Sequence, residues 1–78
     1  MKVVEINRRL GKILRKWRRL QEKDVSPGEQ ILELRKLVKD LDGLYVWKDP
    51  AVSFETRCLH TDLRNTILET IEVLKYRQ

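Results

Sequence analysis

Apolar residues recur every three or four positions along the first third of the chain. They are Val3, Ile6, Leu10, Ile13, Leu14, Trp17 and Leu20. Because an α-helix turns about 100° per residue, this spacing places them on one face and predicts a helix over residues 3–23. The opposite side is basic: Arg8, Lys12, Arg15 and Arg19 lie on it, and Arg9, Lys16 and Lys23 lie on its flank. The first helix is therefore expected to pack through one face and to present cations on the other.

A second apolar stripe follows a short break. The segment Ser26-Pro27-Gly28-Glu29 has the order of a capping box, with Ser26 as the N-cap and a proline in the first turn. The stripe itself consists of Ile31, Leu34, Val38 and Leu41, and Leu37 widens it. Asp42-Gly43 then supplies a turn and a C-terminal glycine. The sequence therefore predicts a helix over residues 27–41.

The third predicted helix is the longest and the least regular. Asp49-Pro50 offers a cap and a first-turn proline, so we expect a helix over residues 50–77. Its apolar stripe consists of Leu59, Leu63, Ile67, Ile71 and Leu74. Phe54 and Cys58 project away from this stripe, which leaves open a break near residues 60–62. The helices then number three or four.

These elements describe a small all-α bundle that forms one domain, residues 1–78. Its 41% hydrophobic and 37% charged residues, with only three Gly and two Pro, are typical of a helical domain. An unbroken third helix would span about 40 Å, against about 23 Å for the second. Because such an overhang exposes apolar side chains, we predict a homodimer that covers them.

The net charge of +5 is concentrated at one end of the chain. Residues 1–24 hold nine Lys and Arg against three Asp and Glu, a net of +6, whereas residues 25–43 sum to −1 and residues 44–78 to 0. An excess on one element indicates an electrostatic contact made by that element. The candidate binding residues are Arg8, Arg9, Lys12, Arg15, Lys16 and Arg19.

Four interpretations of this basic helix are open. It binds nucleic acid, an acidic protein or an anionic membrane surface, or it is a solvated face without a partner. A helix-turn-helix is disfavoured, because that motif reads bases with its second helix and here the first is the basic one. We favour a small accessory or regulatory protein that binds nucleic acid with little sequence specificity. The alternative is an adaptor or inhibitor that binds an acidic surface of a larger protein machine.

Aromatic side chains mark a second candidate surface. The segment Leu44-Tyr45-Val46-Trp47 has strand propensity but no partner strand, so it is interpreted as an apolar connection between helices. Tyr45, Trp47 and Phe54 either anchor a protein partner or close one end of the bundle, and we favour the second. Trp17 belongs to the first apolar stripe and is expected in the core.

Catalysis is not expected. The single histidine, His60, and the single cysteine, Cys58, diverge by about 200° on a helix, which separates a nucleophile from its base. These residues and scattered carboxylates are too few for a metal site, and no cofactor or small-molecule substrate is expected. A lone cysteine fits a reducing cytoplasm. No apolar run reaches the length of a signal peptide or a membrane span, so we expect a cytoplasmic protein.

Overall fold

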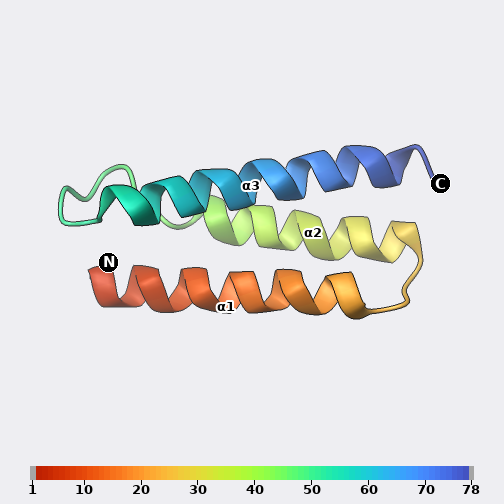
Figure 1. Ribbon diagram of the computed structural model, residues 1–78, viewed down its shortest axis with the longest axis horizontal. Coiled ribbons are helices and arrows are strands. Elements are labelled where there is room, and N and C mark those ends of the chain that lie inside the picture. Colours follow the sequence, from red (N-terminus) through yellow and green to blue (C-terminus); the bar gives the residue numbers. More distant parts are fainter. Residues whose placement is uncertain (1, 78) are drawn as a thin grey trace.

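The computed structural model describes residues 2–77, and over that range the chain forms three helices and no strand. They are α1 (Val3–Glu22), α2 (Pro27–Asp42) and α3 (Phe54–Lys75). Figure 1 shows α2 running antiparallel to both α1 and α3, with the two ends of the chain at opposite ends of the bundle. The predicted all-α bundle is confirmed in its three-helix form. Among the described residues, no helix is both long and apolar enough to cross a membrane.

The first two helices form where the pattern predicts them. Ile6, Leu10 and Ile13 of α1 are buried, and Trp17 is partly buried against the same core. At the start of α2, the Ser26 side chain accepts a hydrogen bond of 3.3 Å from the backbone N–H of Glu29. The helix ends at Asp42, but Gly43 has a φ of −76°, so this end does not use the left-handed backbone that favours glycine.

The predicted start of α3 at Pro50 is wrong, because the helix begins at Phe54. Asp49 closes a turn instead: its Oδ1 accepts from the N–H of Ala51 at 2.9 Å, and its carbonyl accepts from Val52 at 3.1 Å. Ser53 is the N-cap, and its Oγ accepts from the N–H of Thr56 at 3.1 Å. The turn brings Val52 into the core, where it is 3% exposed.

The suggested break near residues 60–62 is not present, because α3 is continuous from Phe54 to Lys75. Its buried side chains are His60, Leu63, Ile67, Ile71 and Leu74. Phe54 lies outside this stripe and is exposed, as its position on the helix indicated.

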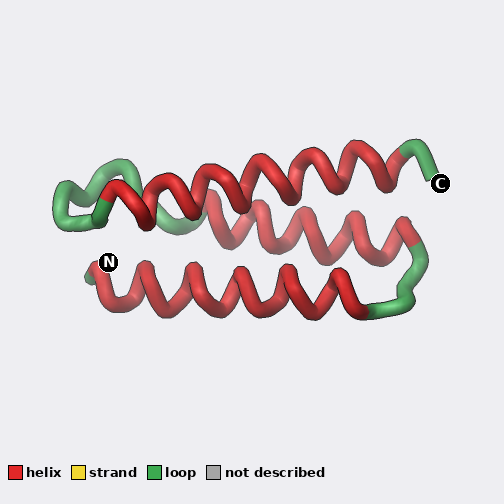
Figure 2. Tube along the Cα trace, in the orientation of Figure 1, coloured by secondary structure: helices red, strands yellow, loops and turns green. Residues whose placement is uncertain are grey.

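The connection between α2 and α3 folds against the end of the bundle where α1 begins (Figure 2). Leu44, Val46 and Val52 fill this end, and Val46 is fully buried. The helices differ less in length than predicted, since α3 has 22 residues and α2 has 16, or about 33 Å and 24 Å. The chain itself therefore covers the overhang, and the length difference no longer supports a dimer.

Candidate nucleic-acid interface

The basic face of α1 is exposed along the whole helix. Burial of Ile6, Leu10 and Ile13 fixes the rotation of α1 in the bundle, so the opposite side chains must point to solvent. All six predicted binding residues are exposed: Arg8, Arg9, Lys12, Arg15, Lys16 and Arg19. Arg18 is also exposed, but it lies to the other side and lines none of the cavities between α1 and α2.

Two adjoining grooves lie between α1 and α2. The first has a volume of about 620 Å³ and is lined by Arg8, Arg9, Lys12, Ile13, Arg15, Lys16, Asp40, Gly43 and Leu44. The second has a volume of about 520 Å³ and is lined by Lys16, Arg19, Leu20, Lys23, Glu33, Lys36, Leu37, Lys39 and Asp40. They share Lys16 and Asp40, and together they are named the α1–α2 groove. Its walls carry nine Lys or Arg side chains against two carboxylates, so the field inside it is positive.

The cations that α1 contributes to this groove are not neutralised within the described residues. The three ion pairs between residues 2 and 77 are Lys36–Glu33, Arg64–Asp42 and Lys75–Glu72. None of them involves α1, and Glu33, one of the two groove carboxylates, is paired with Lys36 of its own helix. The positive charge of α1 is therefore available to an external anion.

Two cations of the groove, Lys36 and Lys39, are absent from the residues that the sequence singled out. Both lie on α2, whose residues are net acidic when counted along the chain. Only the packing of α2 against α1 brings them beside Lys16 and Arg19. Their outward position, off the apolar stripe of α2, is the one signal in the sequence that could have suggested them.

The three predicted aromatic anchors lie at another part of the molecule, around the connection. Tyr45 is 60%, Trp47 58% and Phe54 75% exposed. The expectation that these aromatics close the end of the bundle is therefore wrong, since smaller aliphatic side chains of the connection take that role. The physical reason lies in the local backbone: the segment turns, with a hydrogen bond of 3.1 Å from the N–H of Lys48 to the carbonyl of Tyr45, and its aliphatic side chains face inward.

Two cations hold the exposed rings in place. The Lys48 Nζ lies 4.8 Å from the centre of the Tyr45 ring, and the Arg57 guanidinium lies 5.5 Å from that of Trp47. Arg57 Nη2 also donates to the carbonyl of Asp49 at 2.8 Å, which ties α3 to the connection. Two of the exposed rings thus have a cation beside them, and the aromatic surface is separate from the basic residues of α1.

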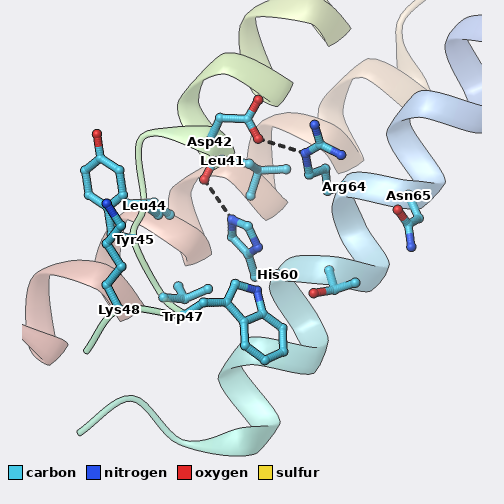
Figure 3. Close-up of a pocket in the computed structure, with 11 residues that line it drawn as sticks. Leu41, Asp42, Leu44, Tyr45, Trp47, Lys48, His60, Arg64 and Asn65 are labelled. Atoms are coloured by element: carbon cyan, nitrogen blue, oxygen red, sulfur yellow. Dashed lines mark hydrogen bonds and ion pairs between the residues drawn. The ribbon is translucent and has the colours of Figure 1, made fainter. Parts of the chain in front are cut away.

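A cavity of about 390 Å³ lies between α3, the end of α2 and the connection (Figure 3). At its edge His60 Nε2 lies 2.7 Å from the carbonyl oxygen of Leu41, and Arg64 Nε donates to Asp42 Oδ1 at 2.7 Å. The hydrogen bond to Asp42, and secondly its charge, raise the pKa of Arg64 above its ordinary value. Cys58 is a free, partly buried thiol. No group of three metal-ligating side chains occurs among residues 2–77.

No protein-family model, curated protein or solved structure matches this chain. Its function must therefore be argued from its own surfaces. Of these, the α1–α2 groove combines the largest excess of one charge with cations that lack ion pairs. It is the strongest candidate for a binding site.

Proposed function

We propose that this protein is a small accessory protein that binds nucleic acid through the basic face of α1, by contacts to backbone phosphates and with little sequence specificity. The observation that carries the proposal is the row of exposed α1 cations without ion pairs, along a groove of net positive charge. Arg and Lys in such a row replace the counterions of several phosphates at once, and phosphate contacts carry no sequence information. The protein then acts by binding rather than by catalysis.

The proposal is tested by fluorescence anisotropy with labelled DNA and RNA across a salt series. We expect the logarithm of the association constant to fall linearly with the logarithm of the salt concentration, by about 0.9 per neutralised phosphate of a DNA duplex. The affinity should be similar for unrelated sequences. Absence of binding to every nucleic acid at low salt would contradict the proposal.

Charge reversal within the groove provides the matched comparison. The double variant Arg15→Glu, Arg19→Glu should lose affinity by at least about tenfold and show a shallower salt slope. The control, Arg18→Glu with Arg35→Glu, changes the net charge equally at exposed positions outside the groove. This control should lose much less affinity. Equal losses in the two variants would show that net charge, and not this face, determines binding.

A second candidate function is favoured by the aromatic surface around the connection. Exposed Tyr and Trp side chains are common anchors of protein interfaces, and Tyr45 and Trp47 are exposed and held by neighbouring cations. Under this alternative the protein is an adaptor or inhibitor that docks on an acidic protein surface. Binding to poly-L-glutamate of matched charge separates the two candidate functions. If the protein binds poly-L-glutamate as tightly as DNA, and Trp47→Ala weakens that binding, the protein partner is supported.

The remaining expectations also stay proposals. We propose that the protein works in the cytoplasm, as its single cysteine suggests. A homodimer is now supported only by exposed apolar side chains, among them Leu32 of α2 and Leu59 and Val73 of α3, which are 61%, 43% and 51% exposed. Sedimentation equilibrium across a concentration series tests it. A single species of 9.4 kDa at every concentration would contradict the dimer.

A further inference from the structure

We infer that the ligand of the α1–α2 groove is duplex DNA, and that Lys39 of α2 contacts its phosphates together with the cations of α1. This inference rests on the proposed function and deepens it. The groove contains cations from two helices, so a bound strand is held from both sides rather than by α1 alone.

The cations along α1 are dense enough to neutralise the phosphates of one strand of a DNA duplex. Six cations of α1 line the groove, namely Arg8, Arg9, Lys12, Arg15, Lys16 and Arg19, and Lys23 follows just after the helix. At about 1.5 Å per residue the six extend over about 17 Å of helix axis, or roughly one cation per 3 Å. A strand of B-form DNA carries one phosphate per about 3.4 Å of duplex axis, and the phosphates lie farther apart along the strand because it winds around that axis. The cations are therefore spaced closely enough for every phosphate along the groove to meet at least one of them.

The groove offers no surface on which unpaired bases could stack. None of its lining residues is aromatic. Trp17 belongs to α1 but packs against the core, and Tyr45, Trp47 and Phe54 lie around the connection. Proteins that bind single strands gain much of their affinity from bases stacked on aromatic rings. In a duplex the bases already stack on each other, so the groove favours a duplex.

Asp40 provides a sharp internal test, because its carboxylate lines both parts of the groove. It is exposed and forms no ion pair within residues 2–77. A phosphate strand along the groove must pass this carboxylate, and the repulsion lowers the affinity. Asp40→Asn should therefore raise the affinity for duplex DNA by about threefold at low salt. Asp62→Asn, the matched control, removes the same charge at an exposed position of α3 outside the groove and should have little effect.

A second pair of variants tests the contribution of α2. Lys39→Gln should weaken duplex binding by about threefold and lower the salt slope by about one, as the loss of one phosphate contact requires. Arg35→Gln removes the same charge from an exposed position of α2 that does not line the groove. It should leave the salt slope unchanged. All four positions are exposed, and far-ultraviolet circular dichroism checks that each variant keeps its helices.

The experiment measures the four variants and the unchanged protein against duplex DNA, duplex RNA and single-stranded DNA of equal length. We expect the unchanged protein to bind duplex DNA most tightly, and we expect the affinity to rise in Asp40→Asn alone and to fall in Lys39→Gln alone. The inference is overturned if single-stranded DNA or duplex RNA binds as tightly, or if either variant behaves like its control. In these cases nucleic-acid binding persists and the proposed function stands. Absence of binding to all three ligands would instead refute the proposed function.

Discussion

His60 of α3 and Leu41 of α2 are joined by a buried hydrogen bond, 2.7 Å long, between the imidazole Nε2 and the backbone carbonyl oxygen. Because a carbonyl only accepts, Nε2 must carry the proton. Leu41 lies in the last turn of α2, where carbonyls lack partners within the helix, and its oxygen also accepts from the N–H of Leu44 at 3.0 Å. One side chain of α3 thus binds α2 at the point where the helix ends and the connection begins (Figure 3).

We expect His60→Ala to lower the free energy of unfolding by about 2–4 kcal/mol, since it removes this hydrogen bond and leaves a cavity. His60→Gln retains an N–H at nearly the same distance from the backbone as Nε2. It should cost less than about 1.5 kcal/mol. Urea unfolding followed by circular dichroism measures both. If the two variants lose the same stability, the hydrogen bond contributes nothing and His60 acts only by filling space.

The connection should be stabilised by its aliphatic residues and not by its aromatic ones. Val46 is fully buried, so Val46→Ala is expected to cost about 2 kcal/mol of unfolding free energy. Trp47→Ala removes a larger side chain, but one that is 58% exposed, and should cost about 1 kcal/mol or less. Thermal and urea unfolding of the two variants give the comparison. A greater loss in Trp47→Ala would mean that the indole belongs to the core.

Gly11 is expected to be a weak point of α1. A glycine within a helix costs about 1 kcal/mol relative to alanine. A Cβ at this position would meet only the end of the Arg15 side chain, at an ordinary contact distance of 3.6 Å. Gly11→Ala should therefore raise the melting temperature by about 4–8 °C. DNA affinity should be unchanged, and a lower melting temperature would show that α1 needs the small residue for packing.

The ion pair between Arg64 and Asp42 should contribute little. Both side chains are more than a third exposed, and Asp42→Asn is expected to cost under about 1 kcal/mol of unfolding free energy, less at high salt. The pKa of Arg64 is raised in the folded protein, so the ion pair contributes its full stability at any pH below the ordinary pKa of arginine. This stability is lost only when the pH rises through the folded-state pKa. The effect of Asp42→Asn should thus be constant from about pH 7 to 9, as urea unfolding can test.

The sequence by itself determined the features that depend on one helix at a time. The 3.6-residue period identified the buried stripe of α1, and the basic face follows because it is the other side of the same helix. The cap at Ser26 could be predicted for the same reason, since it involves residues only three positions apart. These interactions are local, and every partner lies within one or two turns along the chain.

The tertiary structure alone decided the rest, because those features depend on residues far apart in the chain. Asp49-Pro50 and Ser53 are both valid local starts for α3, and the burial of Val52 accompanies the second. The connection of residues 43–53 offers both aliphatic and aromatic side chains to the core, and packing selected the aliphatic ones. Lys39 joins Lys16 in one groove only because α2 packs antiparallel beside α1. Periodicity gives the rotation of a helix about its axis, but not which neighbour lies beside each flank.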